Sequence, residues 1–169
     1  MATFYNNIGI IYMNQGNYEK AIEYYYKSLK INEETGNKRG ITNAYTNIGS
    51  IYLAQGNYDQ ALKYYDKSLK IHEIGDKIGI AGSYNHIGRI YYEQGNYDQA
   101  LEYYDKSLKI FKESDNKIGM AKSYMNIGMI CNDQGDYKQA LAYYDKSLKI
   151  FEKIGDKRGM AVSYNSMGT

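Results

Sequence analysis

Apolar residues recur with a helical period in two successive segments at the start of the chain. In the first segment, Tyr5, Ile8 and Tyr12 fall at i, i+3 and i+7, which places them on one stripe of an α-helix. In the second, an apolar stripe of the same spacing runs from Tyr18 to Leu29. The pattern therefore predicts a pair of amphipathic helices.

Glycines followed by polar residues mark the ends of these helices. Gly16 suits the left-handed conformation that closes a helix, and Asn17 can cap the next one. The same pair recurs at Gly56-Asn57, Gly95-Asn96 and Gly135-Asp136. We expect the second helices to end near Gly36, Gly75, Asp115 and Gly155, and the next first helices to be capped by Asn37, Asp76, Asn116 and Asp156. Gln60, Gln99 and Gln139 stand where the partner of a capping box sits.

The whole pattern is an internal repeat. An Asn-Ile-Gly-like triplet recurs at intervals of 40, 39, 40 and 40 residues, with its glycine at Gly9, Gly49, Gly88, Gly128 and Gly168. A lone helix pair cannot bury its apolar faces, so the pairs must stack on one another. We expect one solenoid domain over residues 1–169, with repeats at about 2–37, 38–76, 77–116 and 117–156 and a partial fifth at 157–169.

Small residues recur inside the helices, where they need a packing reason. A glycine in a helix costs about 1 kcal/mol relative to alanine. We expect Gly9 and Ala21 to lie where the two helices of a pair cross closely. We expect Ser28 and its copies to contact the following pair.

These residues resemble the tetratricopeptide repeat family over essentially the whole chain. The signature is an aromatic residue, Ile-Gly, a tyrosine, an alanine, a second aromatic residue and a small residue: Tyr5, Ile8-Gly9, Tyr12, Ala21, Tyr25 and Ser28. It recurs in three further copies, except that Cys131 replaces the first-helix tyrosine in the fourth. The usual closing proline is absent, and the period near 40 exceeds the common 34. This longer form is similar to repeats of bacterial signalling regulators and animal polarity adaptors. The resemblance implies an all-α fold, a right-handed superhelical α-solenoid of antiparallel helix pairs.

Composition limits the function classes. The chain has 21 basic and 19 acidic residues, which argues against a basic surface for nucleic acid or anionic membranes. No apolar run reaches the length of a membrane span, and no signal peptide precedes the first repeat. The lone cysteine excludes an internal disulfide and fits a reducing compartment, so we expect a cytoplasmic location.

The resemblance implies that the first helices line a concave groove for an extended peptide. In this family the asparagine before Ile-Gly often holds backbone amides of the ligand, and a carboxamide can do so because it both donates and accepts. The candidate peptide-binding residues are the two positions before Ile-Gly, the one after it, and Lys122: Asn6, Asn7, Thr46, Asn47, Ser50, Asn85, His86, Arg89, Lys122, Met125, Asn126 and Met129.

Other interpretations of these residues stay open. The asparagines can cap backbone groups or face water. Arg89 stands four residues before Glu93, the spacing of a helix-surface ion pair, and Lys122 can be merely solvated. Most tyrosines follow the apolar stripes and are expected to be packing residues, whereas Tyr26 and Tyr92 do not follow them.

One ligand-binding mode of the family does not fit. A clamp for C-terminal carboxylates would need basic and asparagine side chains at Asn6, Ile10, Asn47, Arg89 and Glu93. Only Asn47 and Arg89 match, so we do not expect this clamp.

Catalysis is not expected. His72 and His86 each occupy a position that other residues fill in the other copies, and Cys131 replaces a core tyrosine. No metal-binding or phosphate-loop motif is present, so we expect no cofactor and no metal site. Asp66, Asp105 and Asp145 stand beside lysines and are explained by a solvated face.

The sequence therefore predicts a non-catalytic scaffold whose partner is a protein or an extended peptide, not nucleic acid or a membrane. The first alternative is a structural solenoid that forms homo-oligomers by stacking its uncapped ends head to tail, because Tyr164 and Met167 have no following helix to cover them. The second is the sensing arm of a larger signalling enzyme.

Overall fold

The structure, a computed structural model, describes residues 1–71 and 76–168 of the chain. Helices in these ranges are α1 (Ala2–Asn14), α2 (Tyr18–Glu34), α3 (Lys38–Ala54), α4 (Tyr58–Ile71), α5 (Lys77–Glu93), α6 (Tyr97–Glu113), α7 (Lys117–Asp133), α8 (Tyr137–Ile154) and α9 (Lys157–Met167). No strand occurs among the described residues. Gly75, predicted to end a helix, and His72, considered for catalysis, lie outside them.

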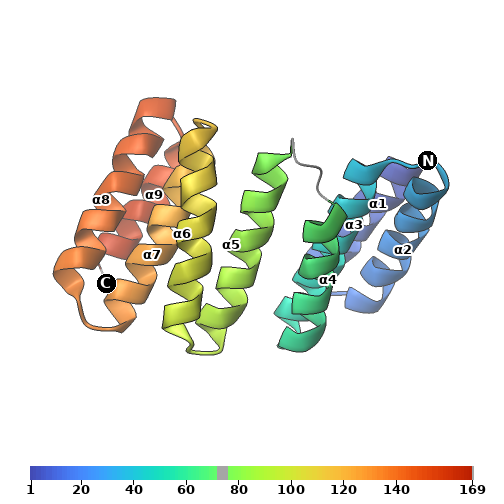
Figure 1. The fold of residues 1–169 in the computed structure, drawn as a ribbon, viewed down its shortest axis with the longest axis horizontal. Helices are drawn as coiled ribbons and strands as arrows, with labels where there is room; N and C mark the ends of the chain where they lie inside the picture. Colours follow the sequence, from blue (N-terminus) through green and yellow to red (C-terminus); the bar gives the residue numbers. More distant parts are fainter. Residues whose placement is uncertain (72–75, 169) are drawn as a thin grey trace. The chain divides into compact units, whose positions relative to one another are not determined.

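The helices form two compact units, Met1–Gly79 and Ile80–Thr169. In the first, α1 packs on α2 and α3 on α4, while α2 and α3 join the two pairs. In the second, α7 packs on α8, and α6 and α9 flank that pair. Successive helices within a unit run antiparallel, joined by short turns (Figure 1). The predicted all-α fold of tandem helix pairs is confirmed.

The predicted helix ends are confirmed wherever the structure describes them. Six glycines in the turns have φ between 65° and 81°, in the left-handed region that glycine adopts without steric cost: Gly16, Gly36, Gly56, Gly95, Gly135 and Gly155. Asp115 takes the same role in the third copy with φ 51°. Because the stop signal is local, the sequence alone locates it.

Side-chain caps begin the helices as predicted. Asn17 Oδ1 accepts a hydrogen bond from the Lys20 N–H, and Asn96 Oδ1 accepts one from the Gln99 N–H. The capping-box expectation is only partly met, because Gln99 Oε1 accepts from the Asn96 side chain at 2.6 Å and not from its backbone. The caps still satisfy helix N–H groups that lack a partner within the helix.

Tyrosine rings of the second helices explain the glycines in the first helices. A Cβ added at Gly9 would lie 2.5 Å from Tyr25 Cε1, and one added at Gly128 would lie 2.7 Å from Tyr144 Cε1. Tyr25 is fully buried, so its ring cannot swing away. The predicted close crossing at Gly9 is confirmed, and the contacting partner is the tyrosine.

A second set of helix glycines lies where one pair meets the next. A Cβ at Gly119 would lie 2.5 Å from Phe111 Cδ1, and one at Gly159 would lie 2.3 Å from Phe151 Cδ1. Asn32 occupies the phenylalanine position in the first copy, where its Oδ1 accepts a hydrogen bond of 2.9 Å from the Asn37 amide. The contact between pairs therefore uses the first turn of the first helix.

Two of the repeated serines form hydrogen bonds within their own helix pair. They are buried: Ser107 Oγ donates to the Ala81 carbonyl at 2.7 Å, and Ser68 Oγ lies 3.3 Å from Thr46 Oγ1. Ala81 and Thr46 belong to the first helix of the same pair, and the predicted contact of the serines with the following pair stays a prediction. Sequence phase shows that the position is buried but not which neighbour the hydroxyl reaches.

Tyrosines and lysines form a recurrent stack within the pairs. Tyr91 stacks on Tyr103 with ring centroids 5.5 Å apart, and Lys106 Nζ lies 4.7 Å from the Tyr103 centroid. Equivalent tyrosine stacks occur at Tyr12–Tyr24 and Tyr52–Tyr64. Tyrosine is thus mainly a packing residue here, as the apolar stripes predict.

Candidate ligand-binding face

The predicted binding residues are accessible on the first helices of both units. Each unit has its own surface of this kind, which we call its first-helix face: α1 and α3 carry it in the first unit, and α5 and α7 carry it in the second. Every one of the twelve predicted residues is half-buried or exposed, whereas Ile48 and Ile127 beside them are buried. The face is therefore separate from the core, but the residues' role in binding stays a prediction.

Polar side chains link neighbouring first helices in the first unit. Asn47 Nδ2 donates to Asn6 Oδ1 at 2.9 Å, across the gap between α3 and α1. Ser50 Oγ lies 3.1 Å from the Tyr65 hydroxyl, at hydrogen-bond distance. One N–H of the Asn47 carboxamide is used in this way, which leaves its second N–H and its Oδ1 for a ligand.

The second unit shows the same lateral arrangement with different residues. Ser123 Oγ donates to Asn85 Oδ1 at 3.4 Å between α7 and α5, and Ser163 Oγ lies 3.9 Å from Met125 Sδ between α9 and α7. Asn126 is half-buried beside Met125. The sequence predicted which positions share the face but not these lateral pairings.

Tyr26 and Tyr92, which depart from the apolar stripes, connect neighbouring repeats. The Tyr26 hydroxyl pairs with the Tyr64 hydroxyl, joining α2 to α4. The Tyr92 hydroxyl donates to Asp133 Oδ2 at 2.7 Å, joining α5 to α7. Burial and this bond to a carboxylate raise the pKa of Tyr92. These two tyrosines lie off the apolar stripes because they contact a helix of the neighbouring repeat.

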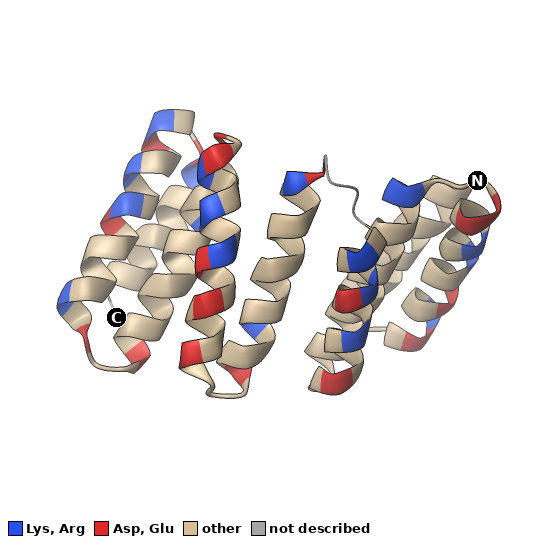
Figure 2. Ribbon diagram, in the orientation of Figure 1, with Lys and Arg blue, Asp and Glu red and all other residues tan. Residues whose placement is uncertain are grey.

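Charge on the first-helix face is restricted to the second unit. The predicted positions of α1 and α3 are uncharged, whereas α5 carries Arg89 and α7 carries Lys122. Figure 2 shows charged residues closely spaced on α6 and α8, while α5 and α7 are uncharged over most of their length. Most charges of the second unit thus belong to the second helices.

His86 lies beside both of these cations. Its pKa is lowered to about 4, first by burial and then by the positive charges of Lys122 and Arg89. Its ring is therefore neutral at pH 7. Arg89 Nε also donates to Glu93 Oε1 at 2.6 Å, so the helix-surface ion pair is confirmed.

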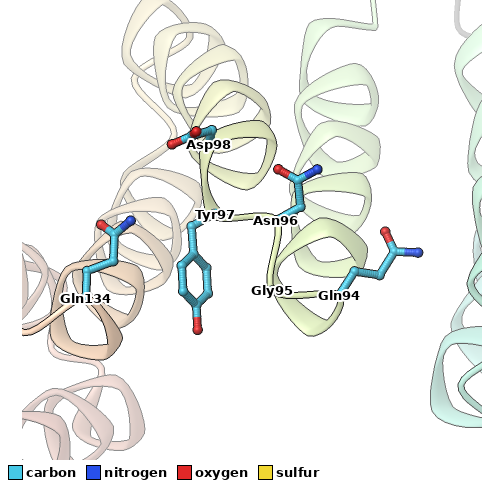
Figure 3. Close-up of a pocket in the computed structure, with 6 residues that line it drawn as sticks. All are labelled: Gln94, Gly95, Asn96, Tyr97, Asp98 and Gln134. Atoms are coloured by element: carbon cyan, nitrogen blue, oxygen red, sulfur yellow. The ribbon is translucent and has the colours of Figure 1, made fainter.

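Two shallow polar clefts lie outside the predicted residues. One is an open surface depression formed by the turn between α5 and α6 together with the residue that follows α7. Figure 3 shows its lining residues: Gln94, Gly95, Asn96, Tyr97, Asp98 and Gln134. An equivalent cleft in the first unit involves Gln15 and Gln55. The recurring Gln-Gly turn was a signal for these clefts, but it was interpreted only as a helix end.

Two of the groups considered for catalysis have structural contacts: Cys131 packs in the core, and Asp145 forms a surface ion pair. Cys131 is buried, and burial raises the pKa of its thiol, which disfavours the nucleophilic thiolate. Asp145 accepts a hydrogen bond of 2.6 Å from Lys149 on the surface of α8. Among residues 1–71 and 76–168, no cluster of three or more His, Cys, Asp or Glu side chains is arranged to hold a metal ion.

A family profile matches the repeats of this chain. The tetratricopeptide repeat profile matches the chain four times, over residues 1–73, 40–113, 79–153 and 119–169. The chain belongs to the tetratricopeptide repeat family. Overlapping matches across the whole length confirm the resemblance seen in the Ile-Gly, alanine and tyrosine positions. No curated protein sequence matches the chain.

Several solved structures share this fold. RapI in its apo form has a TM-score of 0.82 at 25% identity, over 96% of this chain and 60% of its own. A signal transduction ATPase with a tetratricopeptide repeat sensor, from Pyrococcus horikoshii, has a TM-score of 0.81 at 27% identity. The match covers 98% of this chain but 26% of the ATPase. BtubC from P. vanneervenii matches with a TM-score of 0.75 at 21% identity, over 95% of this chain and 70% of its own.

Helices that cross a bilayer are about 20 residues long and mostly apolar. Of the helices that the structure describes, none combines the length and the apolar character that a membrane-spanning helix needs.

Proposed function

We propose that this tetratricopeptide repeat chain is a non-catalytic scaffold that binds extended protein segments on the first-helix faces of its units. Repeats of this family generally mediate protein interactions. The observation that carries the proposal is the set of accessible polar side chains at equivalent positions of successive first helices. Asn47 in the first unit and Asn126 in the second are its central members.

The chemistry of the face suits a peptide backbone. A carboxamide can donate to a carbonyl and accept from an N–H of the same peptide unit. Half-burial gives such a bond more strength than a fully exposed one has, because less water competes for the same groups. The varied neighbours Thr46, Arg89 and Met129 then provide contacts that depend on the ligand's sequence.

The test is peptide selection with variants. The purified chain is presented to a phage-displayed library of random peptides, and the affinities of the selected peptides are measured by fluorescence anisotropy. Replacing Asn47 and Asn126 with alanine is expected to weaken binding about tenfold, because it removes two hydrogen-bonding side chains. The control replaces Asn14 and Gln134, two exposed carboxamides that end or follow first helices. Equal affinities of the two variants would reject the proposal.

A second candidate function is self-assembly. Apolar side chains of α1 and α9 are exposed, among them Phe4 at 62% and Ile11 at 55% on α1, and Tyr164 at 54% on α9. Head-to-tail stacking of copies would cover them. An apparent molecular mass from light scattering that grows with concentration would favour self-assembly over the scaffold function. That mass should fall when Phe4 and Ile11 are replaced by serine. The similarity to the ATPase with a tetratricopeptide repeat sensor favours a variant of the scaffold function. In this variant the chain is the sensing arm of a larger cytoplasmic signalling protein.

A further inference from the structure

Two cations meet beside a neutral histidine on the first-helix face of the second unit. Arg89 and His86 stand three residues apart on α5, so they share one side of the helix. Lys122 comes from α7, which lies alongside α5: the Ser123–Asn85 and Tyr92–Asp133 hydrogen bonds connect the two helices near both ends of the face. The charges of Lys122 and Arg89 both act on His86, so these three basic side chains from two helices form one electrostatic cluster.

The cluster keeps capacity for an anion. Arg89 uses Nε for Glu93, but a guanidinium carries five N–H donors, and the Arg89 side chain is 54% exposed. The Lys122 side chain is exposed as well. Counting Glu93, one positive charge remains uncompensated among Arg89, Lys122 and Glu93 at pH 7. Lys122 and Arg89 together lower the pKa of His86, which shows a positive potential at this part of the face that would attract an anion.

The cluster does not follow from the repeat itself. In the first unit, Asn47 stands at the position of His86, Ser50 at that of Arg89 and Asn43 at that of Lys122. These replacements are neutral, and the fold of the pair is the same. Since packing does not require the basic side chains, a role in choosing the ligand accounts for them better.

We propose that Arg89, Lys122 and His86 form a subsite for a carboxylate, so that the segment bound by this scaffold carries an aspartate or glutamate side chain at that point. The inference rests on the proposed function, because it names the ligand class of the same face. Arg89 would bind the carboxylate through its terminal N–H groups, Lys122 through its ammonium, and His86 through a ring nitrogen.

The experiment uses the same phage-displayed peptide library with two charge-reversal variants of the full chain. One variant is Arg89→Glu/Lys122→Glu. The matched control is Lys109→Glu/Lys138→Glu, which makes the same change of charge at exposed positions of α6 and α8. Circular dichroism of both variants verifies that the helices are retained. Selected peptides are then synthesised with acid-to-amide substitutions and, separately, with an amidated C-terminus.

The expected result is enrichment of aspartate or glutamate at one position of the peptides selected by the wild type. Affinity for them should fall by more than about tenfold in Arg89→Glu/Lys122→Glu and little in the control. A loss on acid-to-amide substitution would support the side-chain carboxylate, whereas a loss only on amidation would mean that the subsite takes a terminal carboxylate and would overturn this assignment.

Two results would reject the subsite. Selected peptides that depend on Asn47 and Asn126 but show no acidic preference would reject it and leave the scaffold function intact. An equal loss in the control variant would assign the effect to net charge and would also reject it. Failure to select any peptide that depends on the asparagines would reject the scaffold function itself, and the subsite with it.

Discussion

The ring of Tyr104 lies directly over Gly88, where an added Cβ would sit 2.8 Å from Tyr104 Cδ1. The Ala100 carbonyl oxygen would be 3.3 Å from the same Cβ, so the clash involves backbone as well as a ring that is 1% exposed. Helix propensity would favour alanine at this position by about 1 kcal/mol. Packing therefore overrides propensity, and contacts of this kind explain why a glycine recurs in the middle of α1, α3, α5 and α7.

Gly88→Ala is expected to destabilise the protein by about 1–2 kcal/mol, because overpacking costs about 1–3 kcal/mol and the propensity gain offsets part of it. Gly82, in the same helix, has no atom within 4 Å of an added Cβ and provides the control. Gly82→Ala is expected to stabilise by up to about 1 kcal/mol. Urea unfolding followed by circular dichroism measures both. A stabilised Gly88→Ala variant would contradict this prediction, because it would show that the Tyr104 ring can move aside at little cost.

Two equivalent serines are expected to respond differently to alanine. Ser107 Oγ donates to the Ala81 carbonyl, whereas the buried Ser147 Oγ has no hydrogen-bond partner. Ser107→Ala should cost about 0.5–1.5 kcal/mol. Ser147→Ala should be neutral or stabilising, because it removes an unsatisfied buried hydroxyl. Urea unfolding compares the variants, and equal losses would contradict the difference in hydrogen bonding.

Acid should destabilise the second unit through His86. The pKa of His86 is about 4 in the folded protein, compared with the ordinary value of 6.5, so the unfolded chain binds a proton first as the pH falls. The contribution of the neutral ring is fully present above pH 6.5 and is lost as the pH falls toward 4.

His86→Asn, which introduces the residue found at positions 47 and 126, removes this titration. Unfolding free energies of the two proteins, measured between pH 7 and pH 4, are expected to diverge, with the wild type losing more. Parallel pH profiles would show that His86 titrates alike in both states.

The Cys131 thiol should react slowly while the protein is folded. It is 6% exposed, and burial raises the pKa of the thiol, so access and ionisation are both reduced. Labelling with a chromogenic disulfide reagent at pH 8 is expected to be slow in buffer and fast in urea. Rapid labelling in buffer would mean that α7 opens locally near its C-terminal end.

Much of the fold is encoded locally and is predictable from the sequence. The glycines with positive φ, such as Gly16 and Gly95, end helices through their own backbone freedom. Asn17 and Asn96 cap the helices that follow, because each accepts a hydrogen bond from the backbone N–H three residues later. The 40-residue repeat then identifies the stacking of pairs, because a lone pair leaves its apolar stripe uncovered. Which positions lie on the first-helix face also followed from phase.

Contacts across the repeats were harder to predict, because they depend on distances that sequence spacing does not give. The axial offset between neighbouring helices decides these hydrogen bonds. Examples are Asn47 to Asn6, Tyr92 to Asp133, and Ser107 to the Ala81 carbonyl. A shift of one turn would preserve every apolar stripe and change each of these partners.

The sequence by itself therefore determined the helices, their ends, the repeat and the family, since these depend on short-range backbone preferences and on periodic burial. Only the tertiary structure decided that Tyr104 requires Gly88, and that Lys122 of one helix acts on His86 of another. The physical reason is that a side chain's partners are set by the approach of two helices in space, which residue types constrain but do not specify.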